Sequence, residues 1–194
     1  MITPIFTTSR GRLLAIGIVA LVQTAALAWM IGDRVRLLKT GREIVLPVVP
    51  VDPRDLFRGD YVTLSYDISR IQLAADLDTK PIRETPYFVV LEKSPDGAWT
   101  AARTGEFEPG PLAPGEVLLK GTLDRTFGWA SGRRWRVAHF GIEKYFVPEG
   151  TGRQLEQAAR DKKLAAVIAV DASGRAAIKG LVVDGKVRYE EPLF

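Results

Sequence analysis

Carboxylates and guanidinium groups alternate closely in one short stretch of this chain. Asp52, Asp55 and Asp60 fall within nine positions, with Arg54 and Arg58 between them. An arginine beside one aspartate lowers the pKa of that carboxyl, while a second carboxylate can act as a base or a ligand. The same residue types also form turns and surface ion pairs. We expect the structural role for this loop, and an enzyme active site is the alternative.

A second cluster combines positive charge with an aromatic ring: Arg133, Arg134, Trp135 and Arg136. Outside a cell such a cluster suits an anionic glycan or lipid headgroup. The simpler alternative is a hairpin with its aromatic side chains inward and its arginines outward.

Metal and covalent chemistry find little support in the residue types. The chain contains no cysteine and one histidine, His139, which excludes thiolate sites and multi-histidine metal sites. No cofactor motif or nucleophile elbow is present. We therefore predict no cofactor and assign no catalytic, cofactor-binding or metal-binding residue.

The positive charge is concentrated near the N-terminus. The chain carries a formal net charge of +4, and residues 1–42 contain six basic side chains against a single acidic one. The remainder is close to neutral, whereas nucleic-acid binding requires a basic face. We predict no nucleic-acid partner.

The basic residues flank an uncharged, apolar segment at positions 13–31. As a helix this segment would span ~28 Å, close to the hydrocarbon thickness of a bilayer. Trp29 near its end suits the membrane interface. We predict a retained transmembrane anchor, with a buried core helix or a cleaved signal peptide as alternatives.

More basic residues follow the segment than precede it, so the positive-inside rule by itself favours a cytoplasmic domain. The position of the segment in the chain favours the opposite orientation. A segment this close to the N-terminus usually acts as a signal-anchor that exports the chain on its C-terminal side. We predict a single-pass protein of the inner (cytoplasmic) membrane, with its N-terminus inside and its domain extracytoplasmic.

The remaining sequence predicts a mainly β fold, an antiparallel barrel or roll. We divide the chain into a tail (1–12), the anchor (13–31), a basic juxtamembrane linker (32–42) and a β-rich domain (43–194). In residues 61–66 the side chains alternate between two faces. Strands are expected at 61–66, 85–92, 98–103, 117–123, 133–140, 142–147, 164–170, 176–183 and 187–189. Residues 43–51 should form an edge strand or an extended crossing segment, because of their prolines.

One helix is predicted in the C-terminal half. Thr151 and Gln154 have the spacing of a capping box. Leu155, Ala158 and Ala159 then form an apolar stripe.

Two motifs resemble a known family. Residues 59–66 read Gly-Asp-Tyr-Val-Thr-Leu-Ser-Tyr, which fits the Gly-Asp-Tyr-x-x-Leu-x-Tyr signature of the GDYXXLXY family of bacterial membrane-anchored proteins. Residues 145–152 are similar to that family's Tyr-Phe-Val-Pro-Glu-Gly segment. Members tend to be encoded beside multi-spanning membrane proteins, so the resemblance implies such a partner and an exported domain, but no chemistry.

We hypothesise that the two motifs meet and form one docking surface. The expected function is a non-enzymatic, membrane-anchored accessory domain on a multi-spanning partner. The alternatives are an envelope hydrolase or isomerase using the aspartate loop, and an anionic glycan- or lipid-binding module using residues 133–136. The candidate interaction surface comprises Asp52, Arg54, Asp55, Arg58, Gly59, Asp60, Tyr61, Tyr66, Tyr145, Pro148, Glu149 and Gly150.

Overall fold

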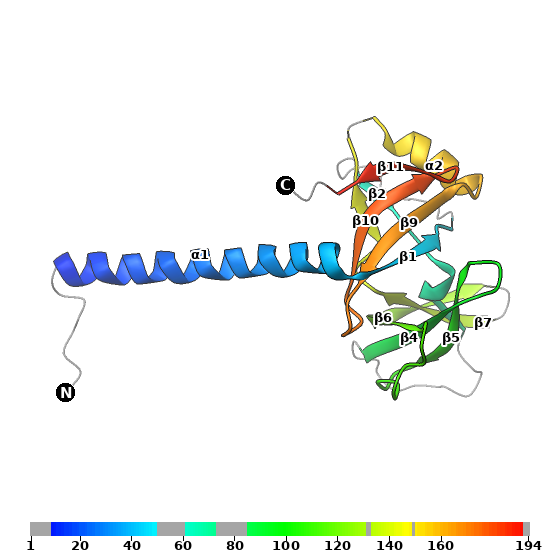
Figure 1. The fold of residues 1–194 in the computed structure, drawn as a ribbon, viewed down its shortest axis with the longest axis horizontal. Coiled ribbons are helices and arrows are strands. Elements are labelled where there is room, and N and C mark those ends of the chain that lie inside the picture. The colour runs from blue at the N-terminus through cyan, green and yellow to red at the C-terminus, as the bar shows by residue number, and fades with distance from the viewer. Residues whose placement is uncertain (1–8, 50–60, 73–84, 131–132, 149, 192–194) are drawn as a thin grey trace. The chain divides into compact units, whose positions relative to one another are not determined.

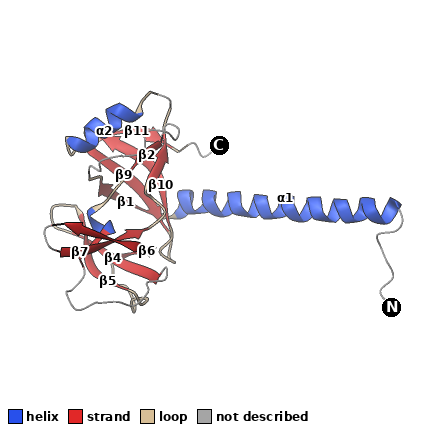
Figure 2. Ribbon diagram, turned by 180° about the vertical axis from the view of Figure 1, so that it is seen from behind, coloured by secondary structure: helices blue, strands red, loops and turns tan. Residues whose placement is uncertain are grey.

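Strands make up most of the described residues beyond the first helix. The computed structural model describes residues 9–49, 61–72, 85–130, 133–148 and 150–191. Within these residues the fold is mostly antiparallel β with two α-helices, as the sequence predicts (Figure 1, Figure 2). The chain divides into two compact units, Met1–Arg36 and Leu37–Phe194.

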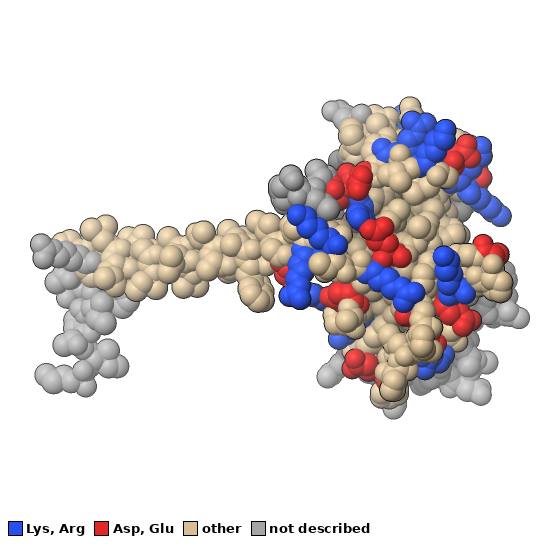
Figure 3. Space-filling view, in the orientation of Figure 1, with Lys and Arg blue, Asp and Glu red and all other residues tan. Residues whose placement is uncertain are grey.

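The first helix, α1, spans Ser9–Thr40. By length and composition its residues Gly11–Thr40 could cross a membrane, with a mean hydropathy of 2.2 over an 18-residue window that is not buried at all. Figure 3 shows this helix bare of charged side chains along most of its length. The predicted anchor at 13–31 is therefore a candidate membrane span. Most of the predicted linker 32–42 continues the same helix.

The last turn of α1 is already part of the β-rich unit. Leu37 and Leu38 are buried against Ala169 and Ala177. Alanine is small, so the last turn of the helix can approach the strands that contain Ala169 and Ala177 closely. Gly41 ends the turn by donating its backbone N–H to the carbonyl of Leu37 at 2.8 Å.

A four-stranded antiparallel sheet has the order β1-β9-β10-β11. Its strands are β1 (Arg42–Pro47), β9 (Leu164–Val170), β10 (Ala176–Val183) and β11 (Lys186–Glu190). The predicted edge position of the first strand is confirmed, because β1 pairs with β9 alone in this sheet. Asp184 and Gly185 both have positive φ, the backbone of a two-residue hairpin turn.

A five-stranded antiparallel sheet has the order β3-β7-β6-β4-β5. Its strands are β3 (Arg70–Gln72), β7 (Arg133–His139), β6 (Val117–Ala130), β4 (Thr85–Lys93) and β5 (Trp99–Gly105). The central part of β4 is buried on both faces. Val89 and Leu91 face the main core, while Phe88 and Val90 form a separate cluster with Leu118. This double burial explains the uninterrupted apolar run in its sequence.

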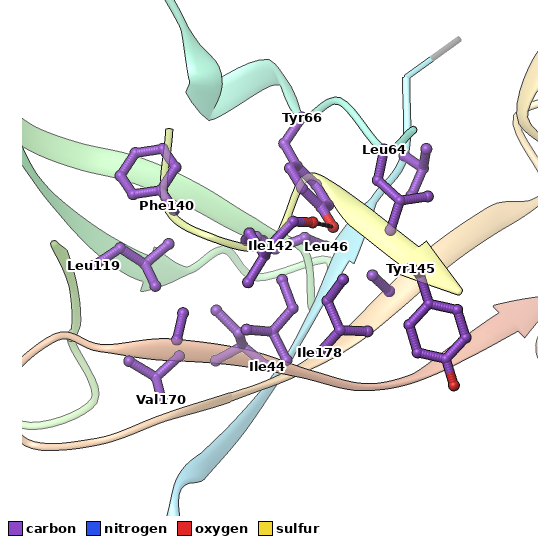
Figure 4. Packing of buried hydrophobic residues seen from close by; sticks show 14 of the residues in the cluster. Ile44, Leu46, Leu64, Tyr66, Leu119, Phe140, Ile142, Tyr145, Val170 and Ile178 are labelled. Carbon is purple, nitrogen blue, oxygen red and sulfur yellow. Dashed lines mark hydrogen bonds between the residues drawn. The ribbon is translucent and has the colours of Figure 1, made fainter. Parts of the chain in front are cut away.

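The third sheet has two strands, β2 (Tyr61–Thr63) and β8 (Lys144–Phe146). The second helix, α2 (Gly152–Arg160), buries the predicted stripe of Leu155, Ala158 and Ala159 in the main core. Residues of all three sheets share that core, and Figure 4 shows part of it. The pairings of the described residues form three sheets, so closure into a barrel stays a prediction.

The start of α2 differs from the prediction. Thr151 has helical backbone angles, and its side chain makes no capping bond to the helix. Instead its Oγ1 donates to the carbonyl of Pro148 at 2.6 Å. The predicted capping box is therefore wrong, because a turn preceding the helix takes the hydroxyl group that would have capped it.

Candidate functional site

The two sequence motifs lie side by side. β2 belongs to the first motif and β8 to the second, and they pair antiparallel with Tyr61 opposite Phe146 and Thr63 opposite Lys144. The backbone N–H of Leu64 extends this contact by donating to the carbonyl of Glu143 at 2.8 Å. The hypothesis that the motifs meet is confirmed for the strands. That they form one docking surface stays a proposal.

The buried face of the first motif fixes a turn in the chain just before the second. Leu64 and Tyr66 are each 1% exposed. The Tyr66 hydroxyl donates to the carbonyl of Ile142 at 2.9 Å (Figure 4). Gly141, next to that carbonyl, has a φ of +76°, a conformation that glycine adopts at no steric cost. The tyrosine thus stabilises the turn that positions β8 beside β2.

Glu143 also stabilises this turn. Its Oε1 accepts a hydrogen bond from the backbone N–H of Phe140 at 2.5 Å. Burial, and secondarily the negative charge of Glu143, raise the pKa of Tyr66 far above its ordinary value. A strongly perturbed pKa often marks an active site. Here burial in the core and the nearby charge of Glu143 account for the raised pKa.

Burial removes two tyrosines from the predicted surface. Tyr66 and Tyr145 are both core residues, because strand alternation turns their rings inward. Figure 4 shows Tyr145 at the margin of the cluster, with its hydroxyl pointing away from the labelled side chains. Burial and the charges of Glu191 and Glu190 raise the pKa of Tyr145. Pro148 and Gly150 are exposed, as predicted.

Sequence reasoning missed Phe146 as a surface residue. Its side chain is 79% exposed, although its neighbour Tyr145 is buried. The signal that could have found it is the alternation of β8: when Tyr145 faces the core, Phe146 must face outward.

The rest of the candidate interaction surface lies outside the described residues. This applies to the aspartate loop at 52–60, to the side chain of Tyr61 and to Glu149. Their roles remain predictions.

A family model described as GDYXXLXY protein matches residues 23–181, which is most of the chain. This chain belongs to the GDYXXLXY family. No curated protein and no solved structure matches it. The family signature now has a physical explanation in part: its leucine and its last tyrosine, Leu64 and Tyr66, are core residues.

The basic cluster of this GDYXXLXY protein is only partly described. Arg136 is 4% exposed, and its Nε and Nη2 donate to the carbonyl of Asp124 at 3.0 and 2.8 Å. A buried guanidinium that bridges β7 to β6 is not available to an external anion, so the prediction that Arg136 belongs to an anionic-ligand surface is wrong. The side chains of Arg133, Arg134 and Trp135 lie outside the described residues.

His139 lies near one carboxylate. Its Nε2 is 3.7 Å from Oδ2 of Asp124, and both side chains are partly exposed. Among the described residues, no group of three or more His, Cys, Asp or Glu side chains is placed to hold a metal ion.

Proposed function

We propose that this GDYXXLXY protein is a membrane-anchored, non-enzymatic accessory protein that docks on a multi-spanning membrane partner. In this proposal α1 is a retained single-pass anchor of the inner membrane, with the N-terminus inside and the β-rich unit extracytoplasmic. The exposed apolar surface of α1 supports the anchor, because exposing such a large apolar surface to water is unfavourable.

The observation that carries the docking proposal is the position of Phe146. A single exposed apolar side chain is ordinary on a protein surface. Phe146 differs because it stands on the strand that the family signature holds in place. Its exposed neighbours are Lys144 on the same strand and Thr63 on the paired strand.

Such a residue has the properties of an interface anchor. Large aromatic side chains contribute much of the binding energy of protein interfaces. The strand that carries Phe146 is fixed by pairing with β2 and by the hydrogen bond of Tyr66 to Ile142. A preorganised side chain loses little entropy on binding.

The polar side chains that hold the two motifs together support binding rather than catalysis. The hydroxyl of Tyr66 and the carboxylate of Glu143 are both engaged in holding one turn. Membrane anchoring adds to the docking, because it raises the effective concentration of the domain near a membrane partner.

The test is a pull-down of the full-length protein from mildly solubilised native membranes, followed by protein identification. We expect the wild type to recover a specific multi-spanning protein. Phe146→Ser should lose it. Val187→Ser should retain it, because Val187 is also an exposed apolar residue, 62% exposed on β11, but lies outside the two motifs.

An Asp55→Ala/Asp60→Ala double variant asks whether the aspartate loop belongs to the same surface. Loss of the partner with this variant and with Phe146→Ser would place both at the interface. Recovery of no specific membrane protein by the wild type would overturn the docking proposal, as would equal recovery by Phe146→Ser and the wild type.

A further inference from the structure

A carboxamide side chain lies in the middle of the apolar segment of α1. Gln23 is within the uncharged segment at 13–31, close to its centre. It lies on an exposed helix, and within the described residues its side chain makes no hydrogen bond to another part of the chain.

This position is costly in a bilayer. The carboxamide has two N–H donors and a carbonyl acceptor. The hydrocarbon core contains no water to satisfy them, so a polar side chain there favours hydrogen bonds to another helix.

The residues around Gln23 suit a close helix contact. Positions three and four apart share a helix face, which places Ala20, Gln23, Thr24 and Leu27 together. Ala20 and Thr24 are small, and small residues let two membrane helices approach closely. The opposite face combines the large side chains of Ile18, Val22 and Trp29 with the small Ala15 and Ala25, and it carries no carboxamide.

We propose that α1 associates with α1 of a second copy of this chain through the face formed by Ala20, Gln23, Thr24 and Leu27. Two parallel copies hold Gln23 at the same depth, whereas an unrelated helix would need a polar group matched to that depth. A carboxamide is also self-complementary, because each can donate to the carbonyl oxygen of the other.

The charged ends of α1 do not oppose this pairing strongly. Arg12, Arg34 and Arg36 lie outside the apolar segment, where water and salt screen like charges. The inference rests on the membrane anchoring in the proposed function, but not on the multi-spanning partner.

Because the chain has no cysteine, each introduced cysteine is the sole thiol of its variant. We would reconstitute full-length Ala20→Cys, Leu27→Cys, Ile18→Cys and Val22→Cys proteins in phosphatidylcholine vesicles at high lipid excess and oxidise them. The expected result is disulfide-linked dimers from Ala20→Cys and Leu27→Cys, and little from the other two variants. Equal linkage at all four positions, or monomers throughout, would overturn the proposal.

Variants of Gln23 test the hydrogen bond itself. Energy transfer between labelled copies in the same vesicles measures the dimer dissociation constant. We expect this constant to be about tenfold higher for Gln23→Leu than for the wild type. Gln23→Asn, which keeps a carboxamide, should stay close to the wild type, as should Val22→Leu on the opposite face. Unchanged association of Gln23→Leu would contradict a role for the carboxamide.

The docking proposal and the self-association proposal are tested independently of each other. These vesicles contain no other protein, so loss of self-association leaves the docking proposal untouched. Conversely, a pull-down without a specific partner would not affect dimers formed in vesicles.

Discussion

At the residue scale, the family signature acts largely through one buried hydroxyl group. Tyr66 is fully enclosed in the core, and its hydroxyl group donates to the carbonyl of Ile142. Without that donor, the carbonyl would be buried and unsatisfied. The benefit of one hydrogen bond is modest, but leaving its acceptor unpaired in the core is expensive.

We therefore expect Tyr66→Phe to lower the free energy of unfolding by about 1–3 kcal/mol. Urea unfolding followed by tryptophan fluorescence measures this change. Tyr189→Phe is the matched control, because Tyr189 is only partly buried at the margin of the core, and its change should be small. Equal effects of the two substitutions would show that the Tyr66 hydrogen bond contributes nothing specific.

Asp171 is a second residue whose side chain holds a turn. Its Oδ1 accepts hydrogen bonds from the backbone N–H groups of Ser173 and Arg175 and from the Ser173 hydroxyl, and its Oδ2 accepts from Nε of Arg175 at 2.7 Å. Burial raises the pKa of this carboxyl, but the hydrogen bonds from Ser173 and Arg175 outweigh it, so the pKa lies below its ordinary value of 3.8.

A lowered pKa of Asp171 in the folded state predicts how the stability of the fold changes with pH. The charged carboxylate stabilises the fold above the ordinary pKa of 3.8, and this contribution disappears as the pH falls through the lower folded value. Asp171→Asn should therefore be less stable than the wild type at pH 7, and the difference should shrink near pH 3. Thermal unfolding at both pH values tests this, and a constant difference would contradict it.

At the element scale, the junction between α1 and β1 depends on close approach. A Cβ atom on Gly41 would lie 2.6 Å from the carbonyl oxygen of Leu37 and 3.0 Å from the backbone nitrogen of Val170. The next residue, Arg42, donates from Nη2 to the carbonyl of Gly115 at 2.8 Å and lies 5.3 Å from the ring of Trp99. The end of α1, the start of β1 and the loop that contains Gly115 are therefore in direct contact.

Gly41→Ala should destabilise the β-rich unit by about 1–3 kcal/mol, because backbone atoms must shift to admit the methyl group. Gly110→Ala is the control, since no atom lies within 4 Å of its Cβ position. Differential scanning calorimetry compares the two. A melting temperature for Gly41→Ala as high as that of Gly110→Ala would show that the junction adapts at no cost.

At the scale of the whole molecule, one apolar helix and one β-rich unit have different requirements of their surroundings. None of the most apolar window of α1 is buried, whereas the β-rich unit encloses its own core. Charges of both signs are interspersed on the face of that unit seen in Figure 3. We therefore expect the two units to separate by solubility.

The full-length chain should remain in the membrane pellet after an alkaline wash, while a 37–194 fragment should be found in the supernatant. The break at residue 36 follows the boundary between the compact units. Digestion of intact spheroplasts with added protease would then degrade the β-rich unit if it is extracytoplasmic. A protected domain would reverse the proposed orientation, and a shortened, soluble native protein would indicate a cleaved signal peptide.

Local patterns predicted much of the fold. Both predicted strands at 164–170 and 176–183 match the bounds of β9 and β10, because these largely apolar segments end at clear turn residues. The apolar stripe of α2 was also predictable. The hydrogen bond of the Thr151 hydroxyl was not, because the turn before the helix determines whether it caps the helix or binds the carbonyl of Pro148.

The candidate site was less predictable from sequence than the fold. The motifs are recognisable in the sequence, but their residues divide by burial into core (Tyr66, Tyr145) and surface (Phe146). Arg136 shows the same limit, since charge suggested exposure and the structure buries it against the Asp124 carbonyl. Burial depends on the elements that pack over a side chain, and those elements come from distant positions.

The sequence alone determined the apolar helix, the strand periodicity and the family, since each depends on composition or on spacing along the chain. Only the tertiary structure decided that the two motifs pair as β2 and β8, and that Tyr66 reaches the carbonyl of Ile142. That hydrogen bond joins residues 76 positions apart. Sequence could not decide these contacts, because no local propensity encodes which distant strands will share a ladder.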